Sequence, residues 1–418
     1  MSLKTHSAQQ NIHRIILSNG ITLLIVENQA ADLVAGRFFF KNAGSIIENR
    51  DRAGISNLVA SVITKGTRNL SALEIAEQVE SIGASLGADA GTDYFLFSLK
   101  AVSGDFAPIL KLLAEIIRFP SFPEEEVELE RKLTLQNIRS QKEQPFNVAF
   151  DALRRNIYGE HPYGVSILGT EDTVSQLDRE TLQQYHQTYF RPDNLTISIS
   201  GRITKEETVR LVEEVFGDWQ IPSTKLRLDL PLAINSEPSA EVIQQETQQS
   251  IVMLGYLGAA VNSADYPVLK LLSTYLGNGL SSRLFVELRE KRGLAYDVSA
   301  FFPTRLEPAF FVTYMGTAPE NTEIAIALLQ EEVERLTKIE LSESELQGAK
   351  NKLLGQYALG KQTNSEIAQI YGWYESLGLG IDFDREFQEA IAKVTPGQAK
   401  SVANKYLINP YISVVKPS

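Results

Sequence analysis

The stretch Gly91–Leu133 reads GTDYFLFSLKAVSGDFAPILKLLAEIIRFPSFPEEEVELERKL, and the stretch Pro308–Leu353 reads PAFFVTYMGTAPENTEIAIALLQEEVERLTKIELSESELQGAKNKL. Each predicts an alternating or aromatic-rich strand, a polar turn, a long amphipathic helix, a short apolar interruption and a second helix with an acidic start. Two such copies, about 220 residues apart, indicate a duplicated unit. We therefore expect an α+β fold of two homologous domains, each a mostly antiparallel sheet covered by helices.

The same periodicities extend the prediction beyond the two repeats. Period-two and β-branched runs predict strands at 15–17, 22–26, 35–40, 94–102, 250–256 and 295–301. Helical periodicity predicts helices at 54–64, 72–82, 106–117, 124–141 and 266–276. The segment 221–239 contains three prolines and is the expected linker. We therefore expect domains at 1–225 and 226–418.

Composition excludes several classes of function. The net charge of −12 leaves no sign of the basic face that phosphate binding requires, so we expect no nucleic-acid partner. The chain has no cysteine, which excludes disulfides, thiolate metal sites and a cysteine nucleophile. Its longest apolar runs are shorter than the roughly 20 residues of a membrane span. The first residues lack the apolar core of a secretory signal, so we expect a cytoplasmic protein, with the periplasm or another compartment open if a signal was removed.

The predicted helix at 54–64 places Asn57 and Ser61 four residues apart, one turn above the other. Two zinc-binding histidines on a helix use this spacing, with a glutamate between them as the base. Asparagine and serine side chains are neutral and poor zinc ligands. No two of the four histidines have this spacing: His6, His13, His161 and His186. We therefore expect no metal in this chain.

The string RAGISNLVASVITKGT around this helix resembles the zinc-binding helix of the pitrilysin/insulinase (inverzincin) metallopeptidase family, which includes mitochondrial processing peptidase. The resemblance puts Asn57 and Ser61 at the two histidine ligands and Ala60 at the catalytic glutamate. In ELERKLTLQNIRSQKEQP it puts Asn137 at the third ligand and keeps the accompanying helix glutamate as Glu130. It implies that all three metal ligands and the base are missing.

The same family has an arginine–tyrosine motif that this chain keeps. The segment NGLSSRLFVELREKRGLAYDVSAFF predicts a helix that stops at Gly293 and a strand after it. The motif matches at Arg289 and Tyr296, and the resemblance implies that these side chains contact substrate beside the scissile bond. Arginine and tyrosine are suitable donors for a substrate carbonyl or a developing oxyanion. In the alternative, Arg289 pairs with Glu287 or Glu290 at the surface and Tyr296 is an ordinary half-buried strand residue.

Three further features resemble the family but have plain alternatives. Gly277, Asn278 and Gly279 occupy the place of the family's glycine-rich substrate loop, or they form a simple turn between helices. The strand at 92–101 resembles the family's substrate-pairing edge and could accept an extended peptide, or it is an ordinary paired strand. His161 and His186 lie in GEHPYGVSILGT and YHQTYFRPDN, where we expect packing or turn roles rather than catalysis.

These observations favour a zinc-less, non-catalytic subunit of a heterodimeric zinc metalloendopeptidase. The expected partner is a homologous chain that carries H-x-x-E-H and the zinc, and the expected substrate is a peptide or an unfolded protein. Arg289 and Tyr296 would act on it in trans. One alternative is a structural scaffold like the core subunits of the respiratory cytochrome bc1 complex, which resemble this family. Another is a peptide-binding maturation partner. The sequence leaves open whether the isolated chain forms a homodimer.

Overall fold

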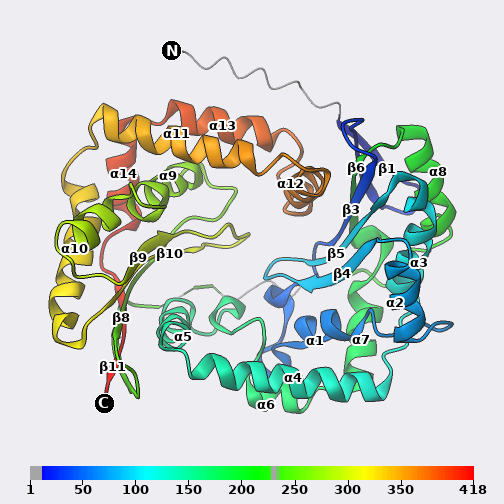
Figure 1. The fold of residues 1–418 in the computed structure, drawn as a ribbon, viewed down its shortest axis with the longest axis horizontal. Helices are drawn as coiled ribbons and strands as arrows, with labels where there is room; N and C mark the ends of the chain where they lie inside the picture. Colours follow the sequence, from blue (N-terminus) through cyan, green and yellow to red (C-terminus); the bar gives the residue numbers. More distant parts are fainter. Residues whose placement is uncertain (1–11, 227–232, 235) are drawn as a thin grey trace. The chain divides into compact units, whose positions relative to one another are not determined.

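A computed structural model describes residues 12–226, 233–234 and 236–418 (Figure 1). Two sheets with helices around them confirm the expected α+β fold. In each sheet one pair of strands is parallel and the other pairs are antiparallel. The N-terminal segment and part of the expected linker lie outside the described residues. Among the described helices, none has the length and apolar character needed to cross a membrane.

The first sheet has six strands in the order β1-β2-β6-β3-β5-β4. They are β1 (Ile12–Ile16), β2 (Thr22–Glu27), β3 (Leu33–Phe40), β4 (Ser85–Ala90), β5 (Phe95–Val102) and β6 (Leu195–Gly201). Every residue of β6 is buried, as expected for a strand in the middle of a covered sheet. Helices of this part are α1 (Ile55–Val62), α2 (Ala72–Glu80), α3 (Phe106–Arg118), α6 (Glu171–Ser175), α7 (Arg179–Tyr189), α8 (Lys205–Phe216) and α12 (Asn364–Ser376).

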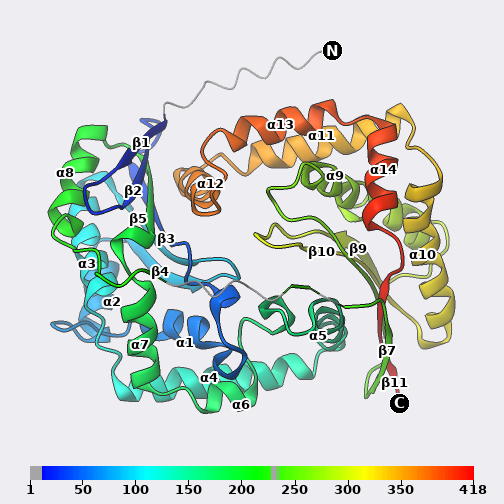
Figure 2. The ribbon, with the colours of Figure 1, turned by 180° about the vertical axis from the view of Figure 1, so that it is seen from behind.

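The second sheet has five strands in the order β7-β11-β8-β10-β9, and its outer strand β7 is labelled in Figure 2. They are β7 (Ala240–Gln245), β8 (Ser250–Leu257), β9 (Asp297–Phe301), β10 (Phe310–Thr317) and β11 (Tyr411–Pro417). Helices of this part are α5 (Pro145–Tyr158), α9 (Tyr266–Gly277), α10 (Thr322–Lys338), α11 (Glu343–Leu359), α13 (Phe383–Lys393) and α14 (Pro396–Tyr406). Helix α4 (Glu124–Lys142) continues from the first part of the chain into the second.

The two sheets repeat one topology. Without β1, the order β2-β6-β3-β5-β4 matches β7-β11-β8-β10-β9 strand for strand in chain order. The parallel pairs, β2 with β6 and β11 with β7, occupy the same place in each sheet. The duplication inferred from the sequence is therefore present in the strand order as well. Helices α1 and α9 have equivalent places in chain order. Helix α1 follows β3 and precedes the edge strand β4, and α9 follows β8 and precedes the edge strand β9.

The compact units are not simple halves of the chain. One comprises residues 1–134, 167–230 and 359–383, and the other comprises 135–166, 231–358 and 384–418. The reason is an exchange of helices. Helix α12 comes from the C-terminal half and packs on β3 and β6, whereas α5 comes from the N-terminal half and packs on β8 and β11. The expected domain boundary between 225 and 226 therefore stays a prediction of where one sequence repeat ends and the next begins.

Glycines allow each exchanged helix to approach its sheet closely. A Cβ on Gly372 of α12 would lie 2.5 Å from the ring of Phe39 and 2.9 Å from Cβ of Ser198. On the other sheet, a Cβ on Gly255 of β8 would lie 2.7 Å from Ile157 of α5. Larger residues would force each helix off its sheet. Polar contacts add to this packing, including an ion pair between Arg14 of β1 and Glu375 of α12 at 2.7 Å.

Candidate functional site

Helix α1, which carries three of the four degenerate zinc-site positions, is fixed at its N-terminus by a buried carboxylate. Glu48 accepts the backbone N–H groups of Gly54 and Ser56, both at 2.8 Å, and also the hydroxyl of Ser56. Burial raises the pKa of Glu48, although these hydrogen bonds act to lower it. Gly54 has a φ of +96°, and a Cβ there would meet the carbonyl oxygen of Leu168 at 2.6 Å. The start of α1 is therefore held on two sides.

The degenerate positions of α1 lie beside its apolar face. Leu58, Val59 and Val62 are fully buried, Ala60 is buried, and Asn57 and Ser61 are half-buried. The Ser61 hydroxyl donates to the carbonyl of Asn57 at 3.1 Å, within the helix itself. Among the described residues, no group of three or more His, Cys, Asp or Glu is arranged to hold a metal ion. An amide, a methyl and a hydroxyl at these positions do not fit zinc, which takes imidazole, thiolate or carboxylate ligands.

The remaining degenerate position, Asn137, is exposed on α4. Glu130 lies two turns before it on the same helix and pairs with Lys65, with Nζ and Oε1 3.1 Å apart. Lys65 follows the last turn of α1, so this ion pair ties α4 to α1. Glu130, the helix glutamate that the family resemblance keeps, is therefore ion-paired with a lysine.

The glycine-rich loop follows α9 and is held tightly. A Cβ on Gly277 would lie 1.7 Å from the backbone nitrogen of Ala300 in β9, so only glycine fits there. The Ser299 hydroxyl donates to the Gly277 carbonyl at 2.7 Å. The amide of Asn278 exchanges two hydrogen bonds with Gln356 of α11, at 2.7 and 3.2 Å. Gly279 has a φ of +77°, which favours glycine.

Arg289 lies in the π-helix η6 (Phe285–Glu290), a rare form that is often found at functional sites. Its side chain is exposed, and its guanidinium carbon is 5.1 Å from the centre of the Phe285 ring. The sequence left open that Arg289 pairs with Glu287 or Glu290. Glu287 pairs instead with Arg283 and Lys291. Within the described residues, Arg289 makes no ion pair with Glu287 or Glu290. Its donors therefore face solvent rather than a carboxylate.

Tyr296 immediately precedes β9, and 62% of it is exposed. Its backbone N–H donates to the carbonyl of Gly316 at 2.9 Å. Gly293, with a φ of +64°, ends the preceding helix as the sequence predicts, and its N–H donates to the Arg289 carbonyl at 3.1 Å. A backbone with these hydrogen bonds carries Arg289 and Tyr296 at the two ends of one tight turn. Both side chains are presented from a well-anchored segment.

The strand at 92–101 is an ordinary paired strand, one of the two interpretations that the sequence left open. Strand β5 pairs with β3 on one side and with β4 on the other. Its hydrogen-bonding groups are already used, so it cannot accept a further strand. The two edges of this sheet are β1 and β4. Within the described residues β4 pairs with β5 alone, so its outer side has no strand partner.

The two framework histidines have packing and turn roles. His161 is 1% exposed, and its Nδ1 accepts the backbone N–H of Tyr163 at 3.1 Å, which caps the turn η4 (Pro162–Gly164). Nε2 of His186 lies 2.7 Å from the Ile117 carbonyl oxygen. Burial lowers the pKa of both imidazoles to about 4. Both rings are therefore neutral at pH 7.

The ionic contacts behind η6 and the edge strand β4 were not predicted from the sequence. Arg283, Glu287 and Lys291 recur every four residues, a charge pattern that indicates an ion-paired helix face. That pattern predicts the face but not its partner Glu332, which comes from α10. Strand β4 reads SLGADA, whose small residues have low β propensity and give no clear signal.

Comparison with known proteins gives the same family from both halves of the chain. Residues 25–171 match the insulinase family, peptidase family M16, and residues 176–353 match the peptidase M16 inactive domain. The uncharacterized zinc protease YmxG of Bacillus subtilis is 28% identical over 359 residues, which cover 86% of this chain and 87% of that protein. An uncharacterized zinc protease of Streptomyces coelicolor is 26% identical over 97% of this chain and 90% of its own length.

Solved structures share the whole fold. A peptidase M16 inactive domain from Pseudomonas fluorescens has a TM-score of 0.90 with 25% identity and covers 98% of both chains. A protease from Helicobacter pylori has a TM-score of 0.89 with 21% identity, covering 98% of this chain and all of the other. Both sequence matches, the duplicated sheets and these structures agree. The chain belongs to the insulinase-type peptidase family M16.

Proposed function

We propose that the chain is the zinc-less subunit of a two-subunit metalloendopeptidase and supplies Arg289 and Tyr296 to a peptide held by a partner. The observation that carries this proposal is the contrast between the two sets of side chains. Asn57, Ala60 and Ser61 offer no zinc ligand or base, whereas Arg289 and Tyr296 are exposed on a segment held by backbone hydrogen bonds. A homologous subunit with H-x-x-E-H would supply the zinc and the water-activating base.

The chemistry assigned to the two side chains is that of hydrogen-bond donors. A guanidinium offers fixed N–H donors to a peptide carbonyl, and a phenol offers one O–H donor to the oxygen that gains charge during attack. Neither group needs to change its own protonation state for this role. Both would bind and orient a substrate, and bond cleavage itself would depend on the partner. The chain by itself is then inactive.

The open strand β4 suggests how the peptide is held. An extended peptide could pair with this edge through backbone hydrogen bonds, which are largely independent of sequence. Such binding suits peptides and unfolded proteins, because a folded substrate has no free strand to offer. Strand β4 thus takes the place of the strand at 92–101 as the candidate for pairing with a peptide.

The test is peptidase activity on a quenched peptide library. The chain alone, an H-x-x-E-H-bearing homologue from the same source alone, and the two mixed with zinc are compared. Activity that needs both chains and falls on Arg289→Ala or Tyr296→Phe supports the proposal. Arg292→Ala serves as the matched control, because Arg292 is an exposed arginine of the same segment. Full activity of the homologue alone, unchanged on addition of this chain, contradicts it.

The same experiment separates the two alternatives. A scaffold subunit would form a stable assembly with its partner that does not respond to Arg289→Ala. A peptide-binding maturation partner would bind a library peptide in the absence of any second chain and release it uncleaved. In either case the mixture would show no activity that depends on Arg289.

A further inference from the structure

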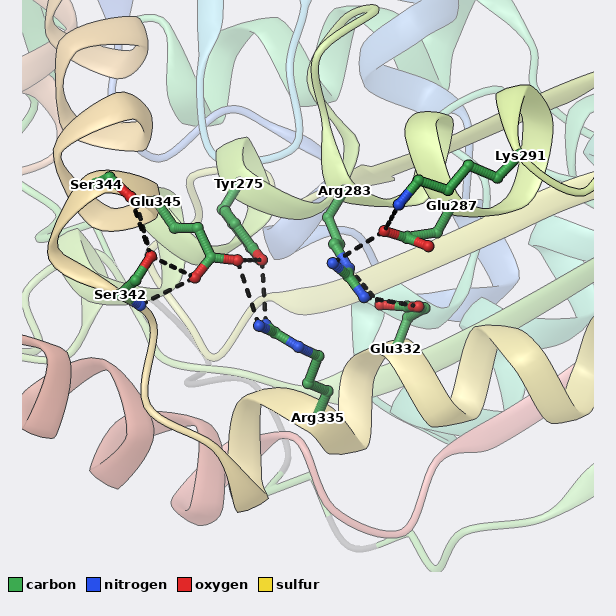
Figure 3. A network of polar contacts seen from close by, with 9 residues as sticks. All are labelled: Tyr275, Arg283, Glu287, Lys291, Glu332, Arg335, Ser342, Ser344 and Glu345. Carbon is green, nitrogen blue, oxygen red and sulfur yellow. Dashed lines mark hydrogen bonds and ion pairs between the residues drawn. The ribbon is translucent and has the colours of Figure 1, made fainter.

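Two charged residues of α10 contact the segment that carries the glycine-rich loop and Arg289, one on each side of the loop (Figure 3). Arg335 reaches Tyr275, near the end of α9, and Glu332 reaches Arg283, just before η6. Glu332 and Arg335 are three residues apart and thus lie on one face of α10. The loop at 276–281 is therefore tied to a single helix at both of its ends.

The contact between Arg283 and Glu332 is a two-point ion pair. Nε of Arg283 donates to Oε2 of Glu332 at 2.7 Å, and Nη2 donates to Oε1 at 3.3 Å. The side chain of Glu332 is 6% exposed and that of Arg283 is 25% exposed. Two nearly parallel hydrogen bonds fix the orientation of the guanidinium plane as well as its position. A buried carboxylate without this partner would be costly, so the pair strongly favours one arrangement.

Arg283 also begins an ion-paired stripe along its own helix. Its Nη1 is 3.0 Å from Oε1 of Glu287, and Nζ of Lys291 is 2.8 Å from the same oxygen. Arg289, on the same helix, takes no part in these ion pairs. The ion pairs therefore hold the helix on α10 without engaging Arg289.

The contact on the other side of the loop involves Tyr275. Its hydroxyl donates to Oε1 of Glu345 at 2.8 Å and accepts from Nη1 of Arg335 at 3.2 Å. Desolvation acts to raise the pKa of Glu345, but hydrogen bonds from Ser342 and Tyr275 together with the Arg335 charge hold it at about 2. Glu345 is thus an anion at every ordinary pH. The end of α9 is fixed before the chain enters the loop.

The π-helix makes this anchoring relevant to Arg289. The N–H of Val286 still donates to Ser282, four residues back, but the N–H of Lys291 donates to Val286, five residues back. A π turn holds one more residue than an α turn and persists where its surroundings enforce it. If the segment relaxed to α-helical turns, the side chains towards its end, Arg289 among them, would rotate by up to about 100° about the helix axis. Arg289 would then point in another direction.

We propose that Glu332 and Arg283 are positioning residues for Arg289. Their ion pair holds the π turn in place and so sets the direction in which the Arg289 guanidinium is presented. Arg335 and Tyr275 support the same segment from the other side of the loop. The role in peptide cleavage rests on the proposed function of Arg289, whereas the control of the segment's structure does not.

The first test is hydrogen exchange of the intact chain, followed by mass spectrometry of peptides that cover 276–294. Glu332→Gln and Arg283→Met are the variants, because each removes one charge and keeps most of the side chain's shape. We expect exchange in this segment to accelerate roughly tenfold in either variant, with little further change when both are combined. Lys338→Met is the matched control, since it removes an exposed ion pair with Glu334 from the same helix.

The second test uses the mixture with the H-x-x-E-H-bearing homologue. Glu332→Gln should raise KM or lower kcat about tenfold, and it should have no further effect when Arg289 is already alanine.

The proposal is overturned if the hydrogen-exchange rate in 276–294 is unchanged, or if exchange accelerates over the whole second unit. It is also overturned if the loss of activity caused by Glu332→Gln adds in full to the loss caused by Arg289→Ala. If the unmodified mixture is inactive, the proposed function fails by itself. The exchange experiment still decides whether Glu332 and Arg283 hold this segment.

Discussion

Helix α1 of the first unit and the segment from α9 to η6 of the second occupy equivalent places in two sheets of the same topology. Their polar side chains differ completely. On α1 the hydroxyl of Ser61 is used within the helix, and no carboxylate or imidazole is present at the degenerate positions. On η6 the guanidinium of Arg289 faces solvent, while Glu287 of the same helix is paired with Arg283 and Lys291. One scaffold thus supports two surfaces with different chemistry, and the fold alone does not reveal which one acts.

Both regions are nevertheless anchored by a buried glutamate. Glu48 holds the start of α1 by accepting backbone N–H groups, and Glu332 holds the start of η6 by pairing with Arg283. The anchoring of α1 therefore does not depend on any metal-binding residue. The side chains at positions 57, 60 and 61 take no part in these contacts of Glu48. Four predictions test this comparison.

The largest expected effect concerns Arg289. In the mixture with an H-x-x-E-H-bearing homologue, Arg289→Ala should lower kcat/KM by about 10²- to 10³-fold, because one aimed donor to a developing oxyanion contributes about 3–4 kcal/mol. Steady-state kinetics on one cleaved peptide measures this. A loss of the same size from Arg292→Ala would show that only the general positive charge matters.

The buried histidines, one in each unit, should give the chain a marked acid sensitivity. Their pKa is about 4 in the folded protein, against about 6.5 in an unfolded chain. The unfolded state therefore binds protons that the folded state excludes, so stability is complete above about pH 6.5 and falls as the pH drops towards 4. Each imidazole should account for about 3 kcal/mol of that loss.

Urea unfolding between pH 4 and 7 measures this loss. His161→Gln and His186→Gln should each flatten the curve relative to the unmodified chain. If neither substitution changes the slope, the loss of stability comes from other groups.

The third prediction restores two ligands to α1. Asn57→His with Ser61→His places two imidazoles at i and i+4, a spacing that binds zinc. Zinc at a hundredfold excess over its dissociation constant should then stabilise the variant by about 2.7 kcal/mol. Thermal unfolding with zinc and then with a chelator measures this. An equal response from the unmodified chain would mean that the present residues already bind zinc.

The smallest effect compares the contacts of the two exchanged helices. Arg14→Met removes the partner of Glu375, whose side chain is only 9% exposed, and should cost about 1–3 kcal/mol. Arg155 of α5 is 3.9 Å from Glu241, and the two side chains are 59% and 38% exposed. Arg155→Met removes this contact and should change stability by no more than about 0.5 kcal/mol. Urea midpoints of the two variants test the order, and equal values would contradict it.

Much of the fold could be predicted because its signals are local. The apolar stripe of α1, the alternation of β5 and the left-handed stop at Gly293 each depend on neighbouring residues, and the structure confirms all three. The edge strand β4 could not be found in this way, because its small residues lack the β-branched pattern of a strand. Its position decides which strand has a free edge, and β5, paired on both sides, is excluded as a peptide-pairing edge.

Contacts between distant parts of the chain set a different limit. The pairing of Arg283 with Glu332 joins residues 49 positions apart, and Arg14 joins Glu375 over 361 positions. Nothing in the local pattern selects one glutamate from many. For the same reason nothing in the local pattern indicates the sheet on which α5 or α12 packs. The Arg289 and Tyr296 assignment came from a motif, and its use in catalysis stays a prediction.

The exchange of α5 and α12 has a consequence for biosynthesis. On the ribosome, β6 is complete at Gly201, but the helix that covers it and β3 ends only at Ser376. At usual elongation rates this helix is made roughly ten seconds or more after the sheet that it covers. The nascent sheet must therefore wait with one apolar face uncovered, where chaperones or aggregation compete with folding. A gene cut near codon 225 would yield two products that each lack a helix, so neither would be a self-sufficient folding unit.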